Sequence, residues 1–285
     1  MNRRCSLLWL GLAVLLEMSR PATAGVIAYE PFSGSDELVG SNGGVGWGGL
    51  WGGIALNTEF TIINLQFAIA DGGTIAGSSN SVLLQNNDFN SGTRPLAAPV
   101  DANVVYLAFL LQGNTNAIGT GDQLLIWLDD LSSGTHANAP NVGWLGNRGN
   151  GSGAEDGFAS LNFGDNEVFS AALSANATHY LVARLRKSAP GAAQVYDRLD
   201  LWLDPTCSDR TVPDAVVVQA PAATALAAFD TIGLGTTGFD GGDIAFIDEL
   251  RLATSWLEVM ACPALALFAD DFESTDTSAW STTVP

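Results

Sequence analysis

The chain has 285 residues, a formal net charge of −19 and a pI near 4.1. Its 11 Lys and Arg against 30 Asp and Glu argue against a nucleic-acid partner, because phosphate binding needs clustered basic side chains. With 47% hydrophobic and only 14% charged residues, the composition is that of a chain that packs a core and excludes the disordered class.

Residues 1–24 are predicted to be a signal peptide. Two arginines precede an apolar run from Ser6 to Leu16, and residues 22–24 are the small residues of a cleavage site. A membrane anchor is the alternative, but it would need roughly 20 apolar residues, and Glu17 and Arg20 interrupt this run. We therefore expect cleavage after Ala24, a secreted or cell-surface protein, and no membrane span.

Short apolar runs then recur between clusters of Gly, Asn, Ser and Asp, which is typical of an antiparallel β-sandwich and not of alternating βα units. Eleven such runs suit two packed sheets. The predicted strands are Val26–Tyr29, Phe60–Ile69, Ser81–Gln85, Val104–Gln112, Gln123–Asp129, Gly143–Asn147, Phe158–Phe163, His179–Lys187, Tyr196–Leu203, Thr231–Leu234 and Asp243–Leu252.

Two neighbouring strands show clear alternation of apolar and polar residues. The segments are Tyr180–Arg186 and Leu199–Asp204, and the Pro-Gly sequence between them favours a hairpin turn at residues 188–192. We therefore predict that these strands pair. Helix is predicted only for the Ala-rich stretch Ala220–Ala228, with a final turn at Ser255–Met260.

The cysteine pattern fits an exported protein. Cys5 leaves with the signal peptide, so Cys207 and Cys262 form an even pair in an oxidising compartment. We expect a disulfide between them, which would stabilise the fold by roughly 4 kcal/mol in the chain-entropy model. Two buried free thiols are the alternative. A cysteine-histidine metal site is not favoured, because His136 and His179 are isolated in the sequence.

Several segments together resemble one known family. The chain looks like the concanavalin A-like, LamG-like jelly rolls of bacterial secreted proteins, over about residues 25–259. The segments that carry this resemblance are Ile27–Phe32, the Gly-rich Asn42–Trp47 and Trp51–Gly53, Leu201–Pro205, and Phe246–Trp256 with its Ile-Asp-Glu-Leu-Arg-Leu strand.

The resemblance implies an all-β domain, a two-sheet antiparallel β-sandwich, at residues 25–260. Its opening and closing strands would lie close together, which would bring Glu30 near Asp248. Such folds carry lectins, glycan-binding modules, glycosidases, polysaccharide lyases and structural domains, so the fold alone decides no function. Residues 261–285 resemble the short acidic Asp-Phe-Glu-Ser tails of some exported bacterial proteins. This tail is either a frayed polar terminus or a sorting or attachment signal.

No candidate catalytic residues emerge from the sequence. Glycoside hydrolysis needs two carboxylates across the scissile bond, and the Glu-x-Asp-x-x-Glu strand of sandwich glycosidases is absent. Asp200 with Asp204, and Asp129 with Asp130, are expected at surfaces or turns. The four tyrosines and two histidines are too scattered to predict a lyase, and no Gly-x-Ser-x-Gly motif is present.

Calcium is the ion that the composition favours, because carboxylate and carbonyl oxygens are plentiful and soft ligands are not. By the resemblance, LamG-like domains often hold one structural Ca²⁺. The candidate ligands are Asp240 and Asp243 in a Gly-containing turn, Asp248 on the closing strand, and Glu30 across from it. In the alternative, the two turn residues cap the turn and Glu249 pairs with Arg251.

Aromatic side chains provide the remaining candidate site, because sugar rings stack on Trp faces while polar loops supply hydrogen bonds. Trp47, Trp51 and Trp144 lie in Gly-rich surroundings, and the polar loop at residues 138–155 adds Asn147 and Arg148. Packing under the Gly-rich loop is the alternative for the first two tryptophans. Trp127 and Trp202 lie inside predicted strands and are expected in the core, and Trp256 is expected to seal the end of the sandwich.

We therefore expect a secreted, non-catalytic module that binds polysaccharide or cell-surface glycan, or that serves a structural or adhesive role. A polysaccharide-degrading enzyme with its acid and base on distant loops is one alternative. A self-assembling surface or matrix protein, favoured by low charge density and abundant Ala and Gly, is the other. The oligomeric state is open.

Overall fold

The structure is a computed structural model. It describes residues 25–34, 37–53, 58–85, 92–113, 121–131, 140–145, 156–162, 167–188, 194–218, 226–239, 242–260 and 262. The predicted signal peptide, the turn at 189–192, most of the predicted helix at 220–228 and nearly all of the acidic tail lie outside these residues. Nothing helical in the described part of the chain is long and apolar enough to cross a membrane.

The described residues form two large antiparallel sheets and one small hairpin. The larger sheet has the order β14-β13-β12-β7-β16-β5-β2, with β1 also paired to β16, and the smaller sheet has the order β11-β10-β9-β8-β15-β6. The strands are β1 (Val26–Glu30), β2 (Thr58–Thr61), β3 (Gln66–Ala68), β4 (Thr74–Ala76), β5 (Ser81–Gln85), β6 (Gly92–Val100), β7 (Val104–Gly113), β8 (Gln123–Asp129), β9 (Asn141–Leu145), β10 (Asp156–Ser160), β11 (Val168–Ala172), β12 (His179–Arg186), β13 (Arg198–Leu203), β14 (Ala215–Val218), β15 (Phe229–Thr237) and β16 (Ile244–Ala253).

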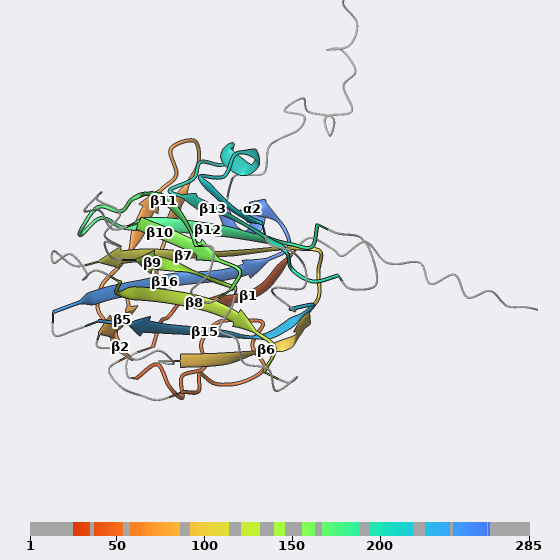
Figure 1. The fold of residues 1–285 in the computed structure, drawn as a ribbon. Coiled ribbons are helices and arrows are strands. Elements are labelled where there is room, and N and C mark those ends of the chain that lie inside the picture. The colour runs from red at the N-terminus through yellow and green to blue at the C-terminus, as the bar shows by residue number, and fades with distance from the viewer. Residues whose placement is uncertain are drawn as a thin grey trace, which may run out of the picture.

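The two large sheets stack face to face, which confirms the predicted β-sandwich of the jelly-roll type (Figure 1). Successive strands cross between the sheets: β5 to β6, β7 to β8 and β15 to β16 each leave one sheet for the other. The first and last strands lie side by side, with Tyr29 opposite Arg251 and Glu30 opposite Leu250. The expectation that the opening and closing strands lie close together is therefore confirmed, and the two strands pair directly.

Alternation along the strands fills the space between the sheets with apolar side chains. The inward-pointing side chains of two strands show this, since all of them are at most 3% exposed. They are Leu124, Ile126 and Leu128 of β8 and Leu181, Ala183 and Leu185 of β12. The predicted pairing of the two alternating segments is also confirmed, because β12 and β13 pair from Leu181–Leu203 to Arg186–Arg198. Period-2 patterning sets this register, since a slip of one residue would turn every leucine to the wrong face.

The outer face of the larger sheet is partly covered by a second apolar cluster. The β3–β4 hairpin supplies Leu65, Ile69 and Ile75, and the short helix α2 (Trp256–Met260) supplies Trp256, Val259 and Met260. These side chains cover Tyr180, Trp202 and their neighbours on the sheet. The predicted final turn at 255–260 is therefore a helix, and Trp127, Trp202 and Trp256 are all buried as expected.

The predicted disulfide is confirmed: Cys207 and Cys262 are bonded, with Cα atoms 5.9 Å apart. The bond lies beside this second cluster, where the Trp256 indole Nε1 donates to the Cys207 carbonyl at 3.1 Å. Asp71, in the turn of the β3–β4 hairpin, accepts the backbone N–H groups of Cys207 and Ser208 at 2.6 and 3.1 Å. The bridge therefore joins the segment after β13 to the segment after α2, under the hairpin.

Four strands escaped the sequence prediction, and one predicted strand divides in two. The run expected at Phe60–Ile69 forms β2 and β3, while β4, β6, β11 and β14 were not predicted. β6 contains Pro95 and Pro99, which argue against a central strand, but it lies at the end of the smaller sheet. Proline is tolerated on an edge strand because its missing N–H removes no bond on the open side.

Candidate functional site

The Gly-rich loop at residues 40–53 spans from β1 of the larger sheet to β6, the edge strand of the smaller sheet. Val45 exchanges backbone hydrogen bonds with Tyr29 of β1, and Trp47 and Gly52 form bridges with β6 at the edge of the smaller sheet. Gly44 and Gly46 have φ of +70° and +83°, and a Cβ on either would collide with a carbonyl oxygen of β1. The glycines are therefore required for the loop to span both sheets at close range.

Beneath this loop lies a buried ion pair between Glu30 of β1 and Arg94 of β6. Arg94 is 0% exposed and Glu30 2% exposed. Arg94 also donates to the Gly49 carbonyl at 3.0 Å and to Asn42 Oδ1 at 2.9 Å, and Trp51 Nε1 donates to Glu30 Oε2 at 3.1 Å. Burial raises the pKa of Glu30, whereas Trp51, Arg94 and the Phe32 N–H lower it. The pair joins the two sheets.

The two loop tryptophans surround the Arg94 guanidinium. Its central carbon lies 4.6 Å from the Trp47 ring centroid and 5.8 Å from that of Trp51. Trp51 is 1% exposed, so protein covers its faces, and the predicted sugar platform is corrected there to the packing alternative. Trp47 is half-buried and donates from Nε1 to the Tyr29 carbonyl at 3.0 Å. Trp47 therefore contacts the Arg94 guanidinium and the backbone of β1.

The predicted metal ligands separate into different roles. Glu30 and Asp248 lie near each other, as the resemblance implied, because Glu30 of β1 stands opposite Leu250, two residues from Asp248 on β16. Glu30, however, already accepts Arg94, Trp51 and the Phe32 N–H, so the structure corrects it from a calcium ligand to an ion-pair partner. Within the described ranges no three His, Cys, Asp or Glu gather to hold a metal.

The other predicted metal residues are less informative. Asp243 is 5% exposed, and Asp240 lies outside the described residues. Asp248 is fully buried on β16, where its Oδ1 accepts the Glu249 N–H at 2.8 Å. Burial raises the pKa of Asp248 to about 8, and the neighbouring carboxylates of Glu249 and Glu30 raise it too, while the Glu249 and Ser78 N–H groups lower it. Calcium binding remains a prediction.

The second predicted ligand-binding segment is not described. Asn147 and Arg148 lie outside the described residues, and for Trp144 only the backbone, in β9, is described. The prediction that this loop frames a ligand therefore stays a prediction. The strands on either side of it, β9 and β10, pair with each other from Leu145–Asp156 to Asn141–Ser160.

A strained glutamate lies where β16 bulges between β1 and β7. Glu249 has φ +52° and is 2% exposed. It accepts the Tyr29 hydroxyl and an Arg251 guanidinium N–H, each at 2.6 Å, which matches the predicted alternative that Glu249 pairs with Arg251. Burial and the Glu249 carboxylate raise the pKa of Tyr29. The cluster holds β1 on β16 through side chains as well as backbone.

A site that the sequence analysis missed lies on the outer face of β12 and β13. Arg184, Arg186 and Arg198 all contact the carboxylate of Asp200, at 2.7, 2.9 and 2.9 Å. Asp200 is 0% exposed, which corrects its expected surface or turn role. We call these four residues the arginine surface. The sequence showed the alternation in both strands and predicted that they pair. Aligning the two strands in that pairing would have placed these arginines and Asp200 on the same face.

Two other acidic residues from the catalytic search have structural roles in the fold. Asp129 is 2% exposed, which corrects its expected surface or turn role, and its Oδ1 accepts the Asp130 N–H at 2.8 Å. Asp204 directly follows the last residue of β13 and has φ +51°, which agrees with its predicted place at a strand end. Its carboxylate accepts the Tyr180 N–H at 2.8 Å and lies 2.7 Å from His179 Nδ1. The other ring nitrogen of His179 accepts the Ser174 N–H at 2.9 Å. Both nitrogens of this histidine are therefore engaged within the fold.

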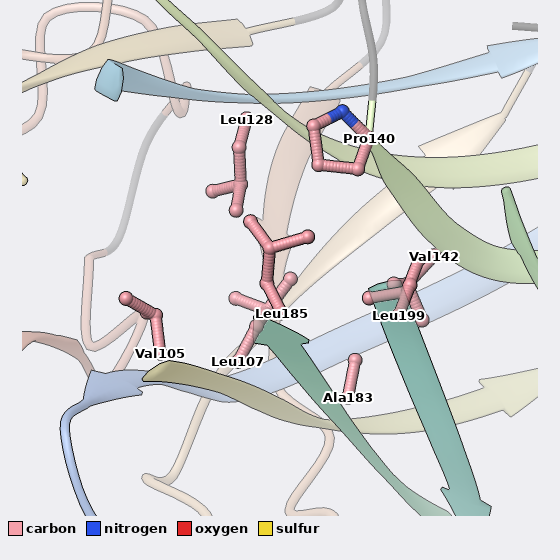
Figure 2. A pocket seen from close by; sticks show the side chains of 8 residues that line it. All are labelled: Val105, Leu107, Leu128, Pro140, Val142, Ala183, Leu185 and Leu199. Carbon is pink, nitrogen blue, oxygen red and sulfur yellow. The ribbon is translucent and has the colours of Figure 1, made fainter. Parts of the chain in front are cut away.

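An apolar pocket lies inside the sandwich, away from these charged groups. Figure 2 shows its lining side chains from strands of both sheets pointing toward one another. All are aliphatic or proline, so the pocket offers no side-chain hydrogen bond to orient a sugar and is best described as a gap in core packing. The lining residues are Val105, Leu107, Leu128, Pro140, Val142, Ala183, Leu185 and Leu199.

No protein-family model matches the chain, and no curated protein sequence matches it. Among solved structures it is similar to the T. cruzi calreticulin globular domain, at 9% identity and TM-score 0.48, covering 83% of this chain and 91% of that one. It is also similar to a glycosyl hydrolase family 16 protein from Mycobacterium smegmatis, at 13% identity and TM-score 0.41, covering 80% and 100%.

A third similar structure is the botulinum neurotoxin serotype G binding domain, at 10% identity and TM-score 0.40, where the match covers 70% of this chain and 46% of that one. The chain thus spans about half the length of that domain. All three likenesses are too distant to assign an activity. The jelly-roll assignment rests on the strand order, and the narrower LamG-like resemblance remains a prediction from the sequence.

Proposed function

We propose that this chain is an exported, non-catalytic β-sandwich module that binds polysaccharide or cell-surface glycan. The observation that carries the proposal is the state of its buried carboxylates. Glu30, Asp200 and Glu249 are each at most 2% exposed, and each accepts hydrogen bonds from arginine. A general acid or base must reach the substrate and exchange a proton with it, whereas these carboxylates hold strands together.

The glycan as ligand is supported by two further arguments. The sequence segments that resemble concanavalin A-like jelly rolls point to a family rich in sugar-binding modules, although the fold hosts other functions too. The arginine surface adds donors on a partly exposed sheet face, and guanidinium groups suit the carboxylate and sulfate groups of sugars because they bind such anions with paired hydrogen bonds.

The test uses the full chain, expressed with its own predicted signal peptide and recovered after export. N-terminal sequencing of the recovered protein checks cleavage after Ala24. The protein is then incubated with a panel of soluble and insoluble polysaccharides, with calcium and with a chelator. Retention on the polysaccharide and newly formed sugar ends are scored in the same samples, with bovine serum albumin as the non-binding control.

Retention on at least one glycan without new sugar ends is the expected result. New reducing ends or unsaturated products would contradict the non-catalytic proposal and favour an enzyme. No retention on any glycan would overturn the binding proposal. Retention that vanishes with the chelator would support the structural calcium ion as well, whereas unchanged retention would argue against a role for calcium in binding.

One observation favours self-assembly as a second candidate function. β14 ends the strand order of the larger sheet, and its Val218 is 63% exposed. Exposed apolar edge strands promote pairing between chains. If the protein assembles through this edge, light scattering should show a mass that rises with concentration, and Val218→Lys should abolish that rise. A constant monomer mass over the same range would exclude assembly through β14.

A further inference from the structure

The arginine surface carries more positive charge than its one carboxylate neutralises. Three guanidinium groups converge on Asp200, in a chain whose formal net charge is −19. By contrast, Arg94 and Arg251 each pair with one glutamate. The arginine surface therefore has two positive charges in excess, whereas the Arg94 and Arg251 contacts are each balanced by one glutamate.

Hydrogen-bond capacity leads to the same conclusion. Three guanidinium groups carry roughly fifteen N–H donors, whereas one carboxylate offers about four lone-pair sites. Asp200 accepts from Arg184, Arg186 and Arg198, and the buried Nε of Arg186 has no hydrogen-bond partner in the structure. Asp200 therefore cannot satisfy all of these donors, and the ones on the solvent side of Arg186 and Arg198, whose side chains are 27% and 34% exposed, are open to water or a ligand.

The arrangement also works against the stability of the sheet. Arg186 lies directly opposite Arg198 in the β12–β13 register, and like charges in that position repel. The pKa of Arg186 is lowered, first by burial and then by the neighbouring Arg184 and Arg198, although Asp200 raises it. A bound anion between the two arginines would relieve this repulsion.

Aromatic residues hold the surface in a fixed shape. The Arg184 guanidinium carbon lies 5.0 Å from the Trp202 ring centroid, and Arg184 stands opposite Tyr106 on β7. Trp202 in turn packs on Trp256 of α2 with ring centroids 5.0 Å apart. These contacts order Arg184, and Arg184 holds the Asp200 carboxylate on which Arg186 and Arg198 also converge.

Exposure rises along β12 from Arg184 to Arg186 and is highest at Arg198 on β13, next to the edge strand. The side chains of Arg184, Arg186 and Arg198 are 15%, 27% and 34% exposed. Arg198 stands opposite the exposed Val218 of edge strand β14. The two outer arginines therefore form the accessible part of the surface, on a strand face that a polymer could lie along.

We propose that the arginine surface binds the carboxylate or sulfate groups of an acidic polysaccharide. This inference rests on the proposed glycan-binding function and names its ligand class. A nucleic acid fits less well, because duplex DNA carries a negative charge every 1.7 Å or so and would meet the −19 charge of the chain. Acidic sugars spread their charges more widely, so one or two groups can meet Arg186 and Arg198 alone.

The test uses three polymers with one backbone: dextran, carboxymethyl-dextran and dextran sulfate. The exported full chain is compared with Arg198→Gln, with Arg186→Gln/Arg198→Gln, and with Arg210→Gln as the matched control. Arg210 is an exposed cation on the 3₁₀ helix Asp209–Thr211, so its substitution changes the net charge by the same amount as Arg198→Gln. Circular dichroism and thermal melting verify that each variant is folded.

We expect the native chain and Arg210→Gln to bind both charged dextrans and not dextran. Arg198→Gln should weaken this binding by several-fold and the double variant by about tenfold or more, because charge-assisted hydrogen bonds are lost. Binding should be strongest near 0.15 M salt. At lower salt the negative chain repels a polyanion over a Debye length of up to about 30 Å, and near 1 M salt the local contacts are screened as well.

Four results would overturn the inference, and a fifth would overturn the proposed function. Equal binding to dextran and its charged forms, or equal losses in Arg198→Gln and Arg210→Gln, would leave glycan binding intact but remove the arginine surface from it. Failure to bind either charged dextran, together with retention on another glycan of the panel, would do the same. Tighter binding to single-stranded DNA than to dextran sulfate would reject the sugar ligand. Failure on every glycan would overturn the proposed function itself.

Discussion

Two regions of this molecule use the same chemical pair, arginine with carboxylate, to opposite effect. Glu30 and Arg94 meet between the sheets, both at most 2% exposed, and each nitrogen of the arginine guanidinium donates to a loop carbonyl, an amide oxygen or the glutamate. Asp200 is equally buried, but its three arginines reach outward and are 15 to 34% exposed. Position relative to the two sheets decides whether the charge is enclosed or available.

The comparison shows what encloses a charge in this fold. At the Glu30–Arg94 pair, the Gly-rich loop spans from β1 to β6 and brings Trp47 and Trp51 onto the guanidinium. On the outer face of β12 and β13, Trp256 of α2 packs on Trp202 and on Tyr106, beside Arg184. The Arg186 and Arg198 side chains stay partly open, at 27% and 34% exposed. A buried pair needs every remaining donor and acceptor satisfied, which the loop supplies at one region only.

The strongest way to break the comparison is to remove one partner of the enclosed pair. Arg94→Met leaves the Glu30 carboxylate buried with no cation, and we expect a loss of about 3–5 kcal/mol in the free energy of unfolding. Glu30→Gln/Arg94→Met is the matched control, and it should recover part of that loss because no buried charge remains. Chemical denaturation measures both. A single-variant loss below about 1 kcal/mol would show that water reaches the carboxylate.

A smaller effect is expected at the open region. Asp200→Asn leaves three arginines without their shared anion, but each can turn part of its guanidinium toward water. We therefore expect a loss of about 2–3 kcal/mol, below that for a fully enclosed partner. Chemical denaturation at low and high salt checks this, because screening should reduce the repulsion among the arginines. A loss as large as that of Arg94→Met would mean that exposure does not distinguish the two regions.

A third carboxylate, Asp248, sharpens the comparison because it is 0% exposed and burial is the main cause of its raised pKa. With a pKa raised to about 8 in the folded protein and near 3.9 in the unfolded chain, it takes up a proton on folding between these values. Its contribution to stability is therefore full below about pH 4 and is lost as the pH rises toward 8. Above that range both states are ionised.

Asp248→Asn should remove this pH dependence. The stability difference between Asp248→Asn and the native chain should move in favour of the variant by about 1 kcal/mol per pH unit from pH 5 to 8, then level off. Urea denaturation at four pH values measures it. Glu258→Gln, on the exposed side of α2, serves as the charge-matched control. Parallel curves for Asp248→Asn and the native chain would contradict a raised pKa.

The smallest expected effect is that of Arg198→Gln on stability. Arg198 is the most exposed of the three arginines, and Asp200 keeps two other partners without it. Exposed ion pairs contribute little, so the loss should stay below about 1 kcal/mol and relief of repulsion with Arg186 could cancel it. Thermal melting checks this. A loss above 2 kcal/mol or so would make Arg198 a structural residue and weaken its value as a binding variant.

Much of the fold was predictable from local patterns in the sequence. Period-2 alternation located β12 and β13 and predicted their pairing, and the Gly, Asn and Ser clusters separated most other strands. The disulfide followed from an even cysteine count in a chain with a predicted signal peptide. These features are local or compositional, so a single chain read in order contains them. β6 was missed because its prolines disfavour a strand unless the strand is known to lie at an edge.

The candidate site was much less predictable. Trp51 looked like a sugar platform because Gly-rich segments are usually loops, yet the tertiary structure folds that loop over a buried cation. Glu30 was correctly expected near Asp248, but its partner Arg94 lies on a strand that the sequence analysis did not identify. The sequence shows that Asp200 and Arg198 alternate on one strand. That Arg184 and Arg186 also reach Asp200 depends on the register between β12 and β13.

The sequence by itself determined that this protein is all-β and acidic and that it has one disulfide. Strand alternation is a pattern between near neighbours in the sequence, and charge and cysteine count are properties of composition, so none of them requires the tertiary structure. The tertiary structure decided which charges are enclosed and which are open. That choice depends on strand order and on the cover that distant segments provide, as the loop at residues 40–53 covers Arg94 while the face beyond α2 leaves Arg198 exposed. Burial is a property of the assembled sheets, and no stretch of sequence contains it alone.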